Sequence, residues 1–127
     1  MSEIEFLEEV YDMKVTDEIK DKHKSIESSY DKKLPKEAKK ILKFTNSKFY
    51  NYKDNNYRIM SLEEVLNAEN ELGIDFSNQK LIPLIDVMDN DFICYDFEKE
   101  KYLIFNIIEE IKLLPMNTIE EIILRLN

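Results

Sequence analysis

The sequence predicts an α+β fold in a single domain over residues 1–127, with N-terminal helices, a mixed or antiparallel β-sheet and a C-terminal amphipathic helix. Apolar residues recur at helical spacing near both ends of the chain. The segment Leu81–Phe97 instead alternates large apolar residues on both faces of an extended strand. Because both faces must escape water, this strand belongs inside a sheet that is covered on both sides. A chain of 127 residues, 43% of them hydrophobic, is large enough to bury one such core.

The first two helices are predicted from capping and periodicity. Ser2 and Glu5 have the spacing of a capping box. Residues 1–15 are therefore expected to form a helix, which can lie at the periphery of the domain. A second helix is expected over Asp17–Ser29, because apolar residues recur there at helical spacing. Its buried edge includes His23, the only histidine, which has no serine or cysteine partner at an informative spacing, so a structural role is expected.

The third helix is expected to carry a lysine-covered surface. Pro35 is predicted at its first position, where the missing N–H of proline costs nothing. The lysines of this helix are Lys36, Lys39, Lys40 and Lys43. They lack arginine and aromatic platforms beside them, which nucleic-acid sites commonly have. The surface is therefore interpreted as a solvated helix face, and no nucleic-acid partner is expected.

The middle of the chain is predicted to contain a hairpin and a capped helix. Residues 49–52 and 57–60 are expected to pair around the turn Lys53–Asn56. Ser61 and Glu64 then have the spacing of a second capping box, which opens a helix. Gly73 is expected to end that helix, since glycine readily adopts the left-handed conformation.

The remaining strands and the last helix follow from shorter patterns. Leu81–Ile85 is predicted to be a strand in which Pro83 marks an edge position or a strand end, because proline cannot donate to a ladder. Tyr102–Phe105 is predicted to be another strand. Ile107–Leu114 fits either a strand after a turn, or one helical turn and a strand. Thr118 begins a third capping-box pattern, followed by an amphipathic helix to the end of the chain.

The charge of the chain is strongly segregated. The formal net charge is −9, but residues 61–127 carry −10, whereas residues 20–53 hold 11 basic against 4 acidic side chains. An acidic half attracts basic protein surfaces and repels nucleic acid. The same charges also fit a solvated face that keeps the protein soluble, which is the simpler interpretation.

Composition also bears on location and cofactors. One cysteine cannot form an internal disulfide, the N-terminus is acidic rather than cationic, and no apolar run is long enough to span a bilayer. A cytoplasmic protein without a membrane partner is expected. The single glycine excludes glycine-rich phosphate-binding loops, and no cofactor is expected.

An aspartate cluster is the only candidate for a chemical site. Asp86, Asp89 and Asp91 could hold a hard cation through carboxylate oxygens, which would make the protein a metal-dependent enzyme. The register of a calcium loop is absent, however, so neither a metal nor catalytic residues are expected. Cys94 lies within the central strand beside acidic residues, where a thiol is a weak nucleophile.

Several short motifs occur in a characteristic order along most of the chain. They are Leu34-Pro35 within Tyr30–Leu42, Ser61-Leu62-Glu63-Glu64 within Ile59–Val65, Ile82-Pro83-Leu84, Asp91–Asp96, Tyr102–Asn106 and the helix that starts at Thr118. In order and spacing these motifs resemble the SMI1/KNR4 (SUKH) superfamily over roughly residues 17–126. Asn46-Ser47 and Asn90 stand where that family usually has glycines, so the chain is identified as a divergent member.

The resemblance implies a protein that binds other proteins and is not an enzyme. Many bacterial members are immunity proteins that neutralise toxin domains, often nucleases, of polymorphic toxin systems, and eukaryotic members act through protein contacts. A basic toxin domain is the partner expected here, and a regulatory adaptor with a housekeeping partner is the alternative. The charge pattern then predicts an acidic partner-binding surface. Its residues are Asp86, Asp89, Asn90, Asp91, Asp96, Glu98 and Glu100.

Overall fold

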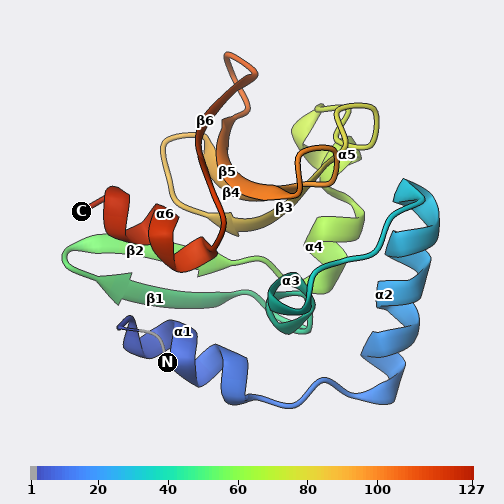
Figure 1. Ribbon diagram of the computed structural model, residues 1–127, viewed down its shortest axis with the longest axis horizontal. Coiled ribbons are helices and arrows are strands. Elements are labelled where there is room, and N and C mark those ends of the chain that lie inside the picture. Colours follow the sequence, from blue (N-terminus) through green and yellow to red (C-terminus); the bar gives the residue numbers. More distant parts are fainter. Residues whose placement is uncertain (1–2) are drawn as a thin grey trace.

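The computed structural model describes residues 3–127, which form six helices and one six-stranded sheet (Figure 1). The helices are α1 (Glu5–Asp12), α2 (Asp17–Tyr30), α3 (Lys36–Ile41), α4 (Leu62–Leu66), α5 (Ala68–Leu72) and α6 (Ile119–Arg125). The strands are β1 (Lys48–Tyr52), β2 (Asn55–Ile59), β3 (Leu81–Asp86), β4 (Asp91–Asp96), β5 (Lys101–Asn106) and β6 (Ile111–Met116). The strands follow one another in chain order, and each neighbouring pair is antiparallel. The α+β prediction is therefore confirmed, with an antiparallel rather than a mixed sheet.

The central strand β4 is buried on both faces, as its sequence predicts. Phe92 and Cys94 point to one face and Ile93 and Tyr95 to the other, and all four are buried. Helix α6 packs against β5 and β6, and α1 packs against α3 (Figure 1). On the face of Phe92, the loop between α5 and β3 supplies Phe76, whose ring meets Phe105 of β5 edge-on. The sheet thus has cover on both sides.

Helix α1 is part of the core. It begins at Glu5, and its N-cap residue Ile4 provides no side-chain cap. A capping box needs the glutamate at the third helical position, whereas Glu5 is at the first, so the predicted capping box does not form. The predicted cap Ser2 lies outside the described residues. Ile4, Leu7 and Val10 are all 0% exposed. The N-terminal helix therefore contributes buried apolar surface to the same cluster as the sheet.

Helices α2 and α3 confirm the helical periodicity, with one correction to the lysine surface. Pro35 is the N-cap of α3 rather than its first residue. Lys43, expected on the solvated face, is only 8% exposed. Its ammonium group donates hydrogen bonds to the carbonyl oxygens of Val10 and Met13, the second at 2.7 Å. Lys43 therefore satisfies carbonyl groups at the C-terminal end of α1, which no sequence spacing indicated.

The hairpin and the capped helix form where predicted, with shifted details. The turn between β1 and β2 consists of Lys53 and Asp54, both with positive φ, and is shorter than the predicted turn. Ser61 and Glu64 form a complete capping box at α4. The predicted single helix is broken at Asn67 into α4 and α5, and Gly73 ends α5 in the left-handed conformation.

Pro83 lies on an interior strand, but at a position that has no partner on one side, so the predicted edge position is local rather than a property of the whole strand. Strand β3 lies between β2 and β4 in the sheet. However, β2 pairs with β3 only through Arg58–Asp86 and Ile59–Ile85, so the ladder on that side has ended before Pro83. The register towards β4 also shifts between Pro83 and Ile85. An interior strand tolerates this proline because local pairing is incomplete and irregular there.

The C-terminal segment settles the ambiguity over Ile107–Leu114. Residues 107–110 form a turn, and the chain then continues as β6. The third predicted capping box is only half formed. The hydroxyl oxygen of Thr118 accepts a hydrogen bond from the Glu121 N–H at 3.2 Å, but the Glu121 carboxylate bonds the Thr118 hydroxyl and not its backbone N–H.

Two opposite substitutions test the cost of left-handed backbone. Gly73 has φ 69° and no atom within 4 Å of the position of a Cβ, so Gly73→Ala adds backbone strain alone. We expect it to lower the free energy of unfolding by about 1 kcal/mol.

Met88 has φ 75°. Met88→Gly should relieve the same strain and raise the free energy of unfolding by about 1 kcal/mol in urea denaturation.

Glu98→Gly is the matched control for Met88→Gly. Glu98 lies in an exposed turn and is not among the residues with positive φ. Glycine there should only increase the entropy of the unfolded chain and lower stability by roughly 0.5–1 kcal/mol. If Met88→Gly were destabilising to the same degree, strain at Met88 would be ruled out.

Candidate partner-binding surface

Strand β4 separates the predicted surface residues into two groups. Asp86, Asp89, Asn90 and Asp91 lie around the turn between β3 and β4, whereas Asp96, Glu98 and Glu100 lie around the turn between β4 and β5. The two turns are at opposite ends of the strand. Since a strand rises about 3.3 Å per residue, they are roughly 17–20 Å apart. The seven residues therefore do not form one compact patch.

The turn between β3 and β4 is held by its own backbone and by Asp86. Three successive residues have positive φ: 75° at Met88, 55° at Asp89 and 68° at Asn90. The Asp91 N–H donates to the Met88 carbonyl at 3.0 Å, and the Met88 N–H donates to Oδ1 of Asp86 at 2.9 Å. Asn90, which stands where the resembled family usually has glycine, thus adopts the left-handed conformation that asparagine tolerates. Asp89 and Asn90 are exposed.

Asp86 is engaged in an ionic network. Nη2 of Arg58 lies 3.2 Å from Oδ2 of Asp86, and Nη1 of Arg58 lies 2.6 Å from Oε2 of Glu64. Burial opposes ionisation of Glu64, but hydrogen bonds from the Ser61 backbone and from Arg58 outweigh it, so the pKa of Glu64 is lowered. Arg58 therefore joins β2, β3 and α4, and the carboxylate of Asp86 is engaged in an ion pair within the molecule.

Asp91 connects this turn with the turn between β5 and β6. Its Oδ1 accepts a hydrogen bond from Nδ2 of Asn106 at 2.8 Å, and Oδ1 of Asn106 accepts from the Glu109 N–H at 2.9 Å. The Ile107 N–H also donates to the Asn90 carbonyl at 2.9 Å. We call the exposed polar residues of these two neighbouring turns the acidic turn surface: Asp89, Asn90, Glu109 and Glu110, with the exposed Ile108 beside them. Sequence reasoning missed Glu109 and Glu110 because it left the boundary of β6 open.

Asp96 is not a surface residue, which corrects its predicted place on the acidic surface. The residue is 0% exposed. Its Oδ1 accepts hydrogen bonds from the N–H groups of Glu98 at 2.9 Å and Lys99 at 3.2 Å, and its Oδ2 lies 3.5 Å from Nζ of Lys112. Asp96 thus shapes the turn that presents Glu98 and Glu100, both of which are exposed.

Cys94 and His23 are both buried. Burial, together with the nearby charge of Asp96, raises the pKa of the Cys94 thiol, which makes it a poor nucleophile. Nε2 of His23 donates a hydrogen bond to the Leu42 carbonyl at 2.5 Å, joining α2 to the end of α3. Burial lowers the pKa of His23 despite this bond, so the ring is neutral at pH 7.

The aspartates do not assemble a metal site. Among residues 3–127, no group of three or more His, Cys, Asp or Glu side chains is placed to hold a metal ion. Asp86 bonds Arg58, and Oδ1 of Asp91 bonds Asn106, so these carboxylates have partners within the protein. The alternative of a metal centre built from Asp86, Asp89 and Asp91 gains no support from this geometry.

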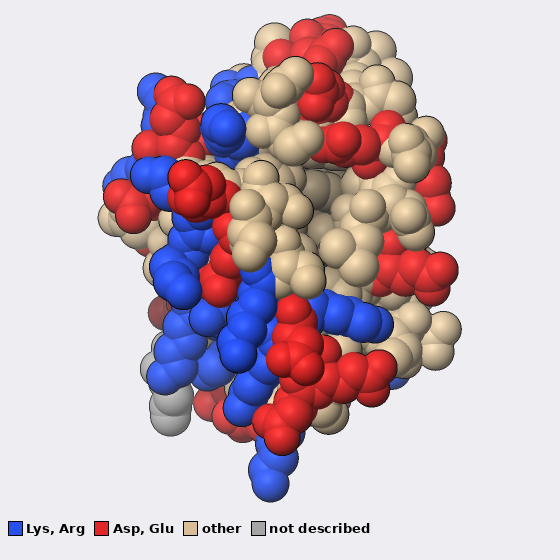
Figure 2. All heavy atoms as spheres, turned by 90° about the vertical axis from the view of Figure 1, so that its right-hand side faces the viewer, with Lys and Arg blue, Asp and Glu red and all other residues tan. Residues whose placement is uncertain are grey.

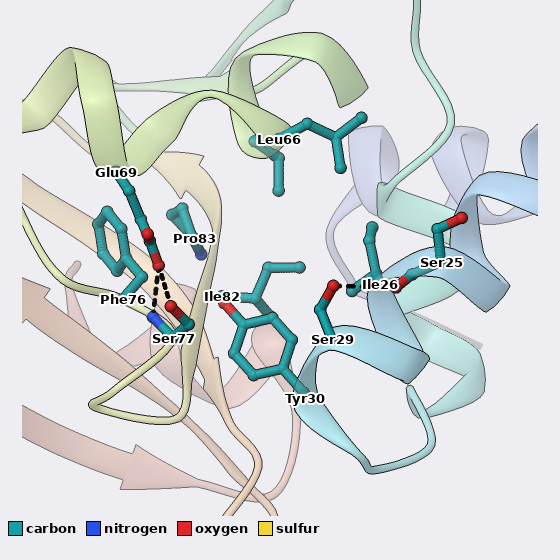
Figure 3. Close-up of a pocket in the computed structure, with 11 residues that line it drawn as sticks. Ser25, Ile26, Ser29, Tyr30, Leu66, Glu69, Phe76, Ser77, Ile82 and Pro83 are labelled. Carbon is teal, nitrogen blue, oxygen red and sulfur yellow. Dashed lines mark hydrogen bonds between the residues drawn. The ribbon is translucent and has the colours of Figure 1, made fainter.

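A hollow of about 250 Å³ lies between α2, the helices α4 and α5, and β3 (Figure 3). Its polar groups are largely satisfied within the molecule. The Tyr30 hydroxyl donates to the Leu81 carbonyl at 2.6 Å, and Oε1 of Glu69 accepts the Ser77 N–H at 2.7 Å. The hollow therefore exposes mainly apolar side chains and shows no arrangement of reactive groups.

A second set of hollows is basic, and sequence reasoning did not predict it. The largest, of about 470 Å³, lies between α2 and α3 and is lined by six lysines. Figure 2 shows the side of the molecule on which α2 lies, where lysine and arginine side chains gather in the lower left part. The excess of basic residues over 20–53 was a usable signal, but the lysines were assigned to a solvated surface because only the packing of α2 beside α3 creates a groove.

The fold and these surfaces define an α+β protein with large charged faces of both signs. The model of the SMI1 / KNR4 family (SUKH-1) matches residues 16–122, so the chain belongs to this family. Family members are in general non-catalytic, immunity-type domains that bind other proteins. No curated protein and no solved structure gave a match. No helix within the described part of the chain is long and apolar enough to cross a membrane.

The network around Arg58 predicts a pH-dependent effect of Glu64→Gln. We expect the substitution to lower the free energy of unfolding at pH 7 by about 1 kcal/mol, since the amide cannot form the ionic bond to Arg58. The folded pKa of Glu64 lies below its ordinary value of 4.5. The contribution of the carboxylate is therefore complete above about pH 4.5 and is lost as the pH falls through the folded pKa. Urea denaturation of wild type and Glu64→Gln at pH 7, and again at a pH below the folded pKa, measures this loss.

Glu63→Gln is the control for this prediction, because Glu63 is exposed on the same helix. It should leave stability nearly unchanged at both pH values. A deficit of Glu64→Gln that stayed constant as the pH fell through the acid range would show that the ionic bond is not its source.

Proposed function

We propose that this chain is an immunity protein, which binds a cognate toxin domain of a bacterial polymorphic toxin system and blocks its activity without catalysis. The observation that carries the proposal is membership of the SMI1/KNR4 family over residues 16–122. The buried states of Cys94 and His23 agree with a role in binding rather than in chemistry. A cytoplasmic site of action, where the toxin would meet its target, fits a chain whose only cysteine is a free thiol.

The partner proposed is a basic domain, such as a nuclease whose active-site cleft is positively charged. The charge of −10 over residues 61–127 supports this choice, because complementary charge accelerates association and occludes a basic cleft. We propose the acidic turn surface as the contact. Asp86 and Asp91 hold its turns in place through their hydrogen bonds to Met88 and Asn106. Glu98 and Glu100, shaped by Asp96, form a second and separate acidic edge.

Co-expression with the product of the adjacent gene tests the proposal. That product should be toxic alone, and the immunity chain should restore growth and co-purify with it. If the chain neither rescues growth nor forms a complex, the immunity function is wrong. Recovery of a housekeeping protein in a native pull-down would favour the regulatory adaptor of the same fold.

Charge reversal distinguishes the two acidic edges. Asp89→Lys should weaken toxin binding at least tenfold, mainly through a slower association rate, because it places a positive charge before a basic surface. Glu98→Lys is the matched control at the opposite end of β4. Surface plasmon resonance at two salt concentrations measures both. If Glu98→Lys proved the more harmful variant, the contact would lie at the other edge.

A further inference from the structure

Three adjoining hollows form a continuous lysine groove along α2 and α3. The central hollow, of about 470 Å³, is lined by Lys20, Lys24, Lys33, Lys36, Lys39 and Lys40. It shares Lys24 and Lys33 with a neighbouring hollow of about 420 Å³, which adds Lys32. It shares Lys36 and Lys40 with a third hollow of about 290 Å³ beside Tyr11. The lysine groove is therefore elongated. Its two walls are supplied by α2 and α3, which are consecutive in the sequence.

The protein itself neutralises only part of this positive charge. Three of the seven lysines lie within 4.0 Å of a carboxylate: Lys20 near Asp17, and Lys33 and Lys39 near Glu27. The central hollow contains one acid, Glu27, whose Oε2 accepts the Leu34 N–H at 2.7 Å and lies 3.6 Å from Nζ of Lys39. Within residues 3–127, Lys24, Lys36 and Lys40 form no ion pair. His23 lines the same hollow, but its Nε2 already bonds the Leu42 carbonyl. The groove thus presents ammonium groups whose counter-charge must come from outside.

The lysine spacing also opposes folding. Lys20 and Lys24 are four residues apart on α2, and Lys36 and Lys40 are four residues apart on α3. Like charges at this spacing destabilise a helix. A lysine in the first turn of a helix, as at Lys36, is also unfavourable because the dipole there is positive. Asp17 offsets the charge of Lys20, and Lys40 lies in the last turn of α3, where the dipole favours a cation. Lys24 and Lys36 have no such compensation, and an anionic ligand would provide it.

The charge of the whole molecule limits the size of that ligand. Seven lysines and three acids line the three hollows, a local charge of +4 in a protein of −9, so the rest of the chain carries −13. A long polyanion extending beyond the groove would meet this negative surface and be repelled. The lysine groove also has no arginine, and Tyr11 is its only aromatic residue, whereas single-stranded nucleic acid is held by stacking on several aromatic rings.

We infer that the lysine groove binds a short, extended, Asp/Glu-rich segment of a partner protein. An extended segment fits three hollows in a row, where a single small anion would occupy one. Side-chain carboxylates on a peptide can reach lysines from both helices, and a flexible ammonium group accommodates several carboxylate geometries. This inference concerns a different surface from the acidic turn surface and does not rest on the proposed immunity function.

A fluorescein-labelled oligoglutamate of about eight residues, roughly 25 Å long when extended, is the probe. Anisotropy titration of the full chain should show saturable binding that weakens as salt is added, since exposed charges are screened. Lys24→Glu/Lys36→Glu reverses one charge on each wall and should weaken binding at least tenfold. Glutamate at position 36 suits the first turn of α3, so the variant should fold.

Lys22→Glu is the matched control, because Lys22 is exposed on α2 but does not line the groove. It should leave the affinity within about twofold of wild type, since its charge is distant and screened. Lys24→Gln/Lys36→Gln should give an intermediate loss of affinity. It removes the two charges without reversing them, so it tests the groove even if the double reversal fails to fold. Equal losses for Lys22→Glu and the groove variant, or no saturable binding at millimolar protein, would overturn the inference.

Competition identifies the chemical class of the ligand. Unlabelled oligoglutamate should displace the probe, whereas inorganic phosphate at the same total charge should not. Displacement by phosphate would show a small-anion site instead of a peptide groove. A single-stranded oligonucleotide of matched charge that competed more strongly than the peptide would assign the groove to nucleic acid and overturn the proposed occupant.

Discussion

Burial of β4 on both faces is the constraint on which the rest of the molecule depends. Residues 92–97 are all buried, so every neighbouring element must remove one of these faces from water. One face is covered by helices that come from the two ends of the chain, and the other receives Phe76 from the loop before β3. The ends of the strand remain accessible only as turns. For this reason the acidic side chains gather at those turns and not across the sheet.

Buried ionisable groups in this protein connect elements of the fold through hydrogen bonds to the backbone. Lys43 joins the segment after α3 to the end of α1, His23 joins α2 to Leu42, and Asp96 holds the turn that follows β4. Each side chain satisfies a polar atom of its own by bonding backbone groups, and a buried polar atom without such a partner would be costly. Their burial is therefore a consequence of the fold, and it gives His23 and Asp96 structural hydrogen bonds to the backbone.

The same fold separates positive and negative surfaces. The lysine groove is built from α2 and α3, whereas the acidic turn surface is built from the turns beside β4 and β5. The proposed contacts of the two surfaces accordingly differ in sign, a basic domain for one and an acidic segment for the other. Membership of the SMI1/KNR4 family agrees with recognition of proteins as the general task.

The sequence by itself determined the fold class, the existence and order of most elements, and the family, because these depend on local periodicity, capping residues and motif order. Ser61 and Glu64, Gly73 and the alternation in β4 formed as predicted, since each acts through near neighbours. Contacts between segments distant in the chain could not be predicted from the sequence. Only the packing of elements buried Asp96, turned Lys43 towards α1 and separated Glu98 from Asp89 along β4. The lysine groove likewise exists only because tertiary structure places α3 beside α2, which no spacing along one helix can reveal.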